Sequence, residues 1–96
     1  MRFTVVWESD AEADLARCWH AANQKLRQQI TTANAYFDRA LAQNAHQKGT
    51  LIRDAYQYRL LVAPPVTGVP IISVAYEVIP DDRLVRVVQY KLTKLD

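Results

Sequence analysis

Apolar residues recur with a helical period through the first half of the chain. One stripe occupies residues 11–22, and a longer one occupies residues 26–41 with polar side chains on its opposite side. This spacing predicts two amphipathic helices that each bury one side. Because no glycine or proline separates the stripes, one continuous helix is an alternative. Asn23 is a favourable N-cap, however, and it places the break near residues 20–23.

Capping residues predict where the helical region begins and ends. Ser9 followed by Glu12 has the pattern of a capping box, so we expect it to open the first helix. Gly49 stands just past the second stripe, where a helix C-cap favours a positive φ. Asp10, Glu12 and Asp14 fall in the first turns of the first helix. There carboxylates interact favourably with the helix dipole, so we do not interpret them as a catalytic cluster.

A strand-like pattern of β-branched and aromatic residues replaces the helical pattern after Gly49, and a similar segment stands at the N-terminus. The predicted strands occupy residues 3–7, 55–63, 71–79 and 84–92. Residues 80–82, Pro-Asp-Asp, are suited to a tight turn between the last two strands. Gly68 marks the loop between the second and third strands.

These elements predict one α+β domain over residues 1–96, in the order β-α-α-β-β-β. A helical hairpin covers one face of a four-stranded sheet, and the last three strands form an antiparallel meander. The first strand joins one edge of this meander, and the sequence does not specify which edge. The predicted core residues are Phe3, Val5, Trp7, Leu15, Trp19, Leu26, Ile30, Phe37, Leu60, Val74, Tyr76, Val85 and Val87.

The composition favours a small cytoplasmic domain that associates with something else. Half of the 96 residues are hydrophobic, and a domain of this size cannot bury them all, so we expect a protein partner or a homodimer. We expect no signal peptide and no membrane span. Cys18 is the only cysteine and cannot form an intramolecular disulfide. With His20 and His46 isolated and only two glycines, we expect no metal site, no phosphate loop and no cofactor.

The strands carry the candidate binding residues. In the second predicted strand Tyr56, Tyr58, Leu60 and Val62 share one face, and Gln57, Arg59 and Leu61 share the other. Residues 83–94 contain several cations and no acid, namely Arg83, Arg86, Lys91 and Lys94. Tyrosines beside cations on an open sheet suit RNA bases and phosphates, and they suit a peptide partner equally well. The alternatives are a solvated basic strand, core tyrosines, and an Arg59 paired with Glu77 across the sheet.

The order of elements resembles the RelE/ParE superfamily of bacterial toxins. Similar local features are the N-terminal strand that runs into an acidic helix start (residues 7–15), Arg59 in the middle strand, and the strand segments 74–78 and 84–88. The resemblance implies a type II toxin–antitoxin system, often involved in plasmid stabilisation, with an antitoxin as partner. It also implies a target that is either DNA gyrase, without catalysis, or ribosome-bound messenger RNA, which is cleaved by attack of the 2′-hydroxyl on the adjacent phosphate.

The resemblance carries over to the site only in part. Arg59 matches one basic position of the nuclease branch, but Gln57 and Ser73 stand where further cations are expected. Near the C-terminus Tyr90 and Lys91 are the remaining catalytic candidates. Tyr56, Tyr58, Arg83, Arg86 and Lys94 are candidates for binding nucleic acid or a partner. The resemblance therefore favours an inhibitor that does not cleave RNA over a degenerate endoribonuclease; a non-toxic RNA- or protein-binding module on the same scaffold is the alternative.

Overall fold

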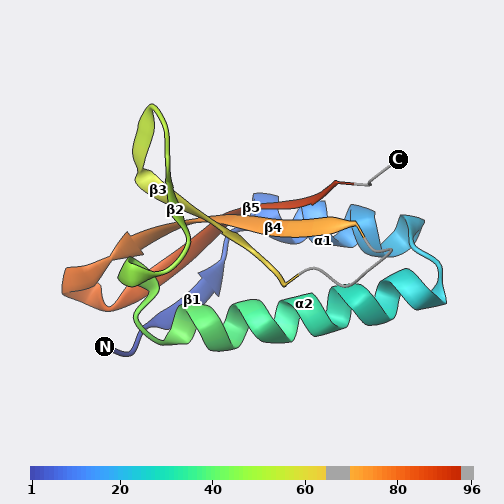
Figure 1. The fold of residues 1–96 in the computed structure, drawn as a ribbon, viewed down its shortest axis with the longest axis horizontal. Coiled ribbons are helices and arrows are strands. Elements are labelled where there is room, and N and C mark those ends of the chain that lie inside the picture. The colour runs from blue at the N-terminus through green and yellow to red at the C-terminus, as the bar shows by residue number, and fades with distance from the viewer. Residues whose placement is uncertain (65–69, 94–96) are drawn as a thin grey trace.

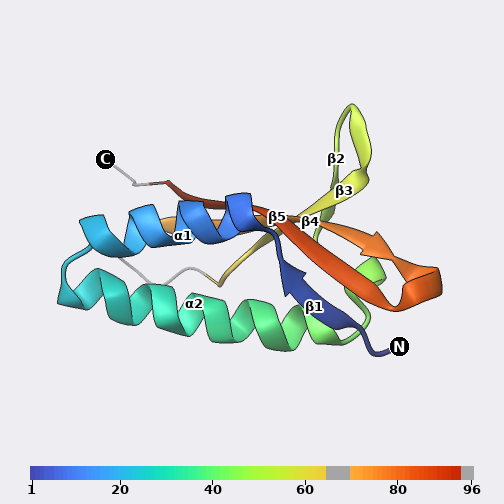
Figure 2. The same ribbon diagram turned by 180° about the vertical axis from the view of Figure 1, so that it is seen from behind.

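Two antiparallel helices lie against one face of a twisted five-stranded sheet in the computed structural model (Figures 1 and 2). The structure describes residues 1–64 and 70–93, without the side chain of Tyr56. The elements in chain order are β1 (Thr4–Trp7), α1 (Ser9–Ala21), α2 (Gln24–Ala42), the 3₁₀ turn η1 (Ala45–Gln47), β2 (Thr50–Ile52), β3 (Ala55–Val62), β4 (Ile71–Ile79), the 3₁₀ turn η2 (Pro80–Asp82) and β5 (Leu84–Thr93). The α+β class and the order of a strand, two helices and a meander are confirmed.

The sheet has the order β1-β5-β4-β3-β2, with β1 parallel to β5 and the other neighbours antiparallel. The first strand β1 therefore joins the meander at its β5 edge, which the sequence did not specify, and Val5 lies beside Val85. The strand β2 was not predicted, because it has only three residues and no alternation long enough to detect. It forms a hairpin with β3 that projects away from the helices (Figure 1).

The break between the helices lies where it was predicted. Asn23 is the N-cap of α2, and its side chain accepts a hydrogen bond from the Leu26 N–H at 2.9 Å. The prediction of a capping box at Ser9 was wrong, because Glu8 is the N-cap of α1 and makes no side-chain cap. The carboxylate of Glu8 instead accepts a hydrogen bond from Arg86 on β5. A cross-sheet ion pair therefore takes the place of the predicted local cap.

Gly49 has the predicted positive φ (+64°) but a different location. The helix α2 ends at Ala42, and Asn44 is the left-handed residue that follows it (φ 54°). Gly49 comes later, between η1 and β2, where the chain passes so close to the Leu60 carbonyl that a Cβ would overlap with it. The backbone there needs glycine for both its conformation and its lack of a side chain. The predicted loop glycine, Gly68, lies outside the described residues.

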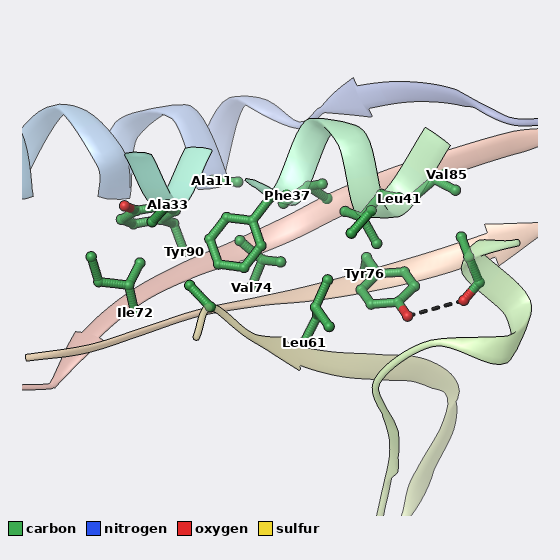
Figure 3. Close-up of a cluster of buried hydrophobic side chains, with 14 of the residues drawn as sticks. Ala11, Ala33, Phe37, Leu41, Leu61, Ile72, Val74, Tyr76, Val85 and Tyr90 are labelled. Atoms are coloured by element: carbon green, nitrogen blue, oxygen red, sulfur yellow. Dashed lines mark hydrogen bonds between the residues drawn. The ribbon is translucent and has the colours of Figure 1, made fainter. Parts of the chain in front are cut away.

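The core fills the space between the helices and the sheet (Figure 3). Phe37 and Leu41 of α2 lie over Val74 and Tyr76 of β4, and Val85 of β5 adds to the same cluster (Figure 3). Of the predicted core residues, those that are buried are Phe3, Ile30, Phe37, Val74, Tyr76, Val85 and Val87. Those that are partly buried and pack against the core are Val5, Trp7, Leu15 and Leu26.

Two predicted core residues are exposed. Trp19, near the end of α1, is 37% exposed and lies under the guanidinium of Arg27, 5.2 Å from the ring centre. Leu60 is 39% exposed because the odd-numbered residues of β3 face the helices, as the 7% exposure of its neighbour Leu61 shows. Apolar residues stand on both faces of β3, so the pattern that placed Leu60 in the core does not define which face is covered.

Candidate binding sites on the sheet and along helix α2

Arg59 projects from β3 on the side of the sheet that the helices occupy, at a point beyond the end of α2. It pairs with Tyr76 in the register of β3 and β4. Its Nε donates a hydrogen bond to the Lys48 carbonyl at 2.6 Å, and the Tyr76 hydroxyl donates to the same oxygen at 2.7 Å. Burial raises the pKa of the Tyr76 hydroxyl, and the nearby Arg59 charge offsets part of that rise. Arg59 therefore holds the segment after η1 against the sheet.

The alternative that Arg59 pairs with Glu77 was wrong. The register places Tyr58, not Arg59, opposite Glu77, and the Glu77 carboxylate accepts a hydrogen bond from Arg86 at 3.1 Å. Among residues 1–64 and 70–93, no acid forms an ion pair with Arg59. The side chain is only half-buried, so its terminal N–H groups can reach a ligand.

An open groove of about 400 Å³ lies beside Arg59, and we call it the hairpin groove. It forms where the pairing of β3 with β4 ends at Tyr58 and Glu77, while β4 continues along β5 to Ile79. The residues that line it are His46, Leu51, Gln57, Arg59, Glu77, Val78, Ile79 and Pro80. His46 was not predicted to contribute, because the sequence placed it in helical surroundings. Its ring packs against Phe3 in a tilted arrangement, with ring centres 5.6 Å apart.

Tyr90 and Lys91 do not join Arg59. Tyr90 is 3% exposed and packs in the core against Trp7 and Phe37, with ring centres 5.9 and 6.5 Å away. Burial strongly raises the pKa of its hydroxyl, which has no hydrogen-bond partner among the described residues. Lys91 is exposed on the opposite face, beside Ser73. Because neighbouring residues of a strand point to opposite faces, Tyr90 and Lys91 do not share one groove with Arg59.

Arg86 lies at the centre of an ion-pair cluster that spans three elements. Its Nε is 2.5 Å from a Glu8 carboxylate oxygen, and one of its terminal nitrogens is 3.1 Å from Glu77 on β4. The hydrogen bond and the charge of Glu8 raise the pKa of the Arg86 guanidinium, and Glu77 raises it further. One cation of the acid-free segment, Arg86, is thus neutralised by acids from elsewhere in the fold.

The remaining predicted binding residues are spread over the surface. Arg83 is exposed at the turn after η2 and has a positive φ (49°). Tyr58 is half-buried on the uncovered face of the sheet. Lys94 lies outside the described residues, as does the side chain of Tyr56. The structure therefore does not assemble a continuous basic surface from the residues it describes in the segment 83–94.

The uncovered face of the sheet is largely apolar where the helices leave it open. Leu60 and Val62 of β3 and Ile71 of β4 are each more than a third exposed. Ser73, which stands where the nuclease branch has an arginine, lies between them and is buried. This face can pack against a protein, and β4, the central strand of the sheet, presents no cation on it; Lys91 of β5 lies beside Ser73.

A second groove follows α2 on the side where β3 runs past it, and we call it the α2 groove. It consists of two adjoining hollows of about 430 and 470 Å³ that share Tyr36 and Arg39. Its floor includes Ala33, Leu61 and Ile72. The charged side chains that line it, within residues 1–64 and 70–93, are Lys25, Arg39 and Lys48, all of them basic. The sequence showed Lys25 and Arg39 only as members of the polar side of the helix.

Other kinds of site find little support in the described part of the chain. No group of three or more His, Cys, Asp or Glu side chains is placed to bind a metal ion within residues 1–64 and 70–93. Burial and the nearby Asp14 raise the pKa of the Cys18 thiol, which lowers its thiolate fraction at neutral pH. Among the described helices, none is both long and apolar enough to cross a membrane.

The arrangement of elements is similar to that of three solved structures. A chain of the toxin–antitoxin complex RelBE2 from Mycobacterium tuberculosis matches with a TM-score of 0.67 and 14% identity, covering 100% of this chain and 95% of that one. The chromosomal ParDE toxin–antitoxin system from P. aeruginosa matches with a TM-score of 0.67 and 14% identity, covering 97% and 98%. The isolated E. coli RelE toxin matches with a TM-score of 0.58 and 12% identity, covering 100% and 88%.

Sequence comparison adds nothing to this likeness. No family model matches the chain, and no curated protein matches it. At 12–14% identity the likeness concerns the fold, which is that of the RelE and ParE toxins. The resemblance inferred from the order of elements is thereby confirmed at the level of the fold.

Proposed function

We propose that this chain is the toxin-type member of a cytoplasmic toxin–antitoxin pair and forms a single domain over residues 1–96. The observation that carries the proposal is the fold, which is shared along nearly the whole chain with proteins of the RelBE2, ParDE and RelE systems. A fold alone does not define an activity, so the mechanism depends on the sites.

The arrangement of cations favours action by binding a protein over cleavage of RNA. Cleavage needs a base for the 2′-hydroxyl, cations for the phosphorane and an acid for the leaving oxygen, all around one phosphate. Here Arg59 and Lys91 lie on opposite faces, and Tyr90 is in the core. We therefore infer a protein target, such as DNA gyrase, in preference to ribosome-bound messenger RNA. Arg59 is the residue that we propose contacts it or the antitoxin.

The α2 groove is the surface that we propose for the antitoxin. Among the described residues its charged lining is entirely basic and its floor is apolar, so it is complementary to an amphipathic segment that carries acids. Such a segment would bury Tyr36 and approach Arg39, which lines both hollows. Large aromatic and arginine side chains are the residues that most often dominate the energy of an interface.

Co-purification with the product of the adjacent reading frame tests the surface. We expect Arg39→Glu to weaken the complex by about tenfold or more, because it places an acid opposite an acidic partner. Arg53→Glu is the matched control, since Arg53 is exposed in the turn of the β2–β3 hairpin and lines neither hollow. Equal losses for both variants would show that only the net charge matters. An unchanged complex with Arg39→Glu would exclude the α2 groove.

A further inference from the structure

Arg59 is held in a way that leaves its outer edge available to a ligand. Its Nε donates a hydrogen bond to the Lys48 carbonyl at 2.6 Å, and this bond fixes the plane of the guanidinium. The two terminal nitrogens, with their N–H groups, form the end-on fork that binds a carboxylate with two parallel hydrogen bonds. Since none of the acids in the described part of the chain pairs with this side chain, the fork has no internal partner there.

The charges around the hairpin groove leave Arg59 as its available cation. Glu77 also lines the groove, but its carboxylate is bound by Arg86 from the next strand. Gln57, two residues before Arg59 on the same strand face, adds an amide that can donate to an oxygen atom. A half-buried cation without an ion-pair partner keeps a strong tendency to bind an anion, because its charge is screened less than that of a fully solvated side chain.

Apolar side chains flank Arg59 in the hairpin groove. Leu51, which is half exposed, is its partner on β2, and Val78, Ile79 and Pro80 lie at the end of β4 on the other side of β3. The groove thus combines an anion-binding fork with a hydrophobic surface. A polyphosphate chain gains nothing from the apolar part of the groove, whereas an acidic residue with apolar neighbours contacts both the Arg59 fork and the hydrophobic surface.

We propose that the hairpin groove binds an acidic side chain of a partner polypeptide, with its carboxylate on the Arg59 fork and an adjacent apolar residue against Leu51 and Val78. This site shares none of its lining residues with the α2 groove, so it provides a second, separate contact. The proposal rests on the proposed function only for the identity of the polypeptide, which is the antitoxin.

Titration of the isotope-labelled full chain, followed by NMR, tests the site. The probes are a blocked pentapeptide of alternating valine and glutamate, the same peptide with glutamine in place of glutamate, and a uridine hexanucleotide. We expect the glutamate peptide to shift the resonances of Gln57, Val78 and the Arg59 side chain. We expect the glutamine peptide to bind at least about tenfold more weakly, since it has no carboxylate to accept the two hydrogen bonds of the Arg59 fork.

Two variants separate binding from folding. Arg59→Lys keeps the charge but loses the fork, and Gln57→Leu leaves the contact between Arg59 and the Lys48 carbonyl intact. Both variants should weaken binding of the glutamate peptide by about threefold or more, while the melting temperature of Gln57→Leu stays unchanged. Arg53→Lys should bind like the parent chain. Equal binding of the two peptides, stronger binding of the hexanucleotide, or no shift at about 10 mM peptide would overturn the proposal. None of these results depends on growth inhibition, so the site can fail while the proposed function holds.

Discussion

Replacing Gly49 with alanine is the sharpest perturbation of the segment that positions Arg59. The residue has φ +64°, a left-handed conformation that costs an L-amino acid about 1–2 kcal/mol. The added methyl group would also overlap with the Leu60 carbonyl and lie 3.1 Å from the Tyr76 hydroxyl. Because the Leu60 contact is backbone, relief requires a shift of β2 or β3, and such overpacking costs about 1–3 kcal/mol.

These terms combine to a substantial loss of stability. Alanine lowers the entropy of the unfolded chain and returns about 0.4–1 kcal/mol, so the net loss should be about 2–4 kcal/mol. A domain of this length is stabilised by roughly 5–14 kcal/mol in total, and the variant should still fold at room temperature. The shift should also move the Lys48 carbonyl that Arg59 and Tyr76 both bind.

Urea unfolding followed by circular dichroism measures the change. The midpoint should fall with little change in slope, because the surface exposed on unfolding is nearly the same. Asp54→Gly is the matched control, since Asp54 also has a left-handed φ (66°) but is exposed at the hairpin turn. Its stability should change by less than about 1 kcal/mol. A loss below about 1 kcal/mol for Gly49→Ala would refute the close approach to Leu60.

Three further substitutions or modifications test the core. Phe37→Ala should lower the free energy of unfolding by about 3–5 kcal/mol, because the ring is fully buried; an unchanged melting temperature would contradict its place in the core. Burial raises the pKa of the Tyr90 hydroxyl, so the contribution of Tyr90 to stability is complete below about pH 10 and is lost as pH rises further. Tyr90→Phe should therefore make the alkaline fall in stability shallower by up to about 1.4 kcal/mol per pH unit. Cys18 should react with iodoacetamide at neutral pH more slowly than in the urea-unfolded chain, and equal rates would show that the thiol is not shielded.

The fold was largely predictable, because it depends on periodicity that the sequence shows directly. The two helices, the four longer strands and the break at Asn23 follow from spacing and capping. The short strand β2 does not, because three residues carry no period. The start of α1 also differed, since a long-range ion pair between Glu8 and Arg86 replaced the local cap at Ser9.

The candidate site was much less predictable, because it depends on which face of each strand is covered. The odd-numbered residues of β3, including Arg59, face the helices, and the even-numbered residues, including Leu60, face the open side. The reverse arrangement was equally compatible with the sequence. A register irregularity between Ala75 and Tyr76 in the pairing of β4 with β5 brings Tyr76 opposite Val87, so counting along the strands alone does not align their faces. The hairpin groove and its member His46 arise only from this three-dimensional arrangement.

Growth after induced expression, with and without the adjacent reading frame, is the measurement that tests the central claim most directly. The account predicts that the chain alone arrests growth, that co-expression of its partner restores growth, and that cellular messenger RNA stays intact during the arrest. An Arg53→Glu variant should behave like the parent chain in the same assay. Unimpaired growth with the folded chain present, or cleavage of messenger RNA as the arrest begins, would contradict a toxin that acts by binding a protein.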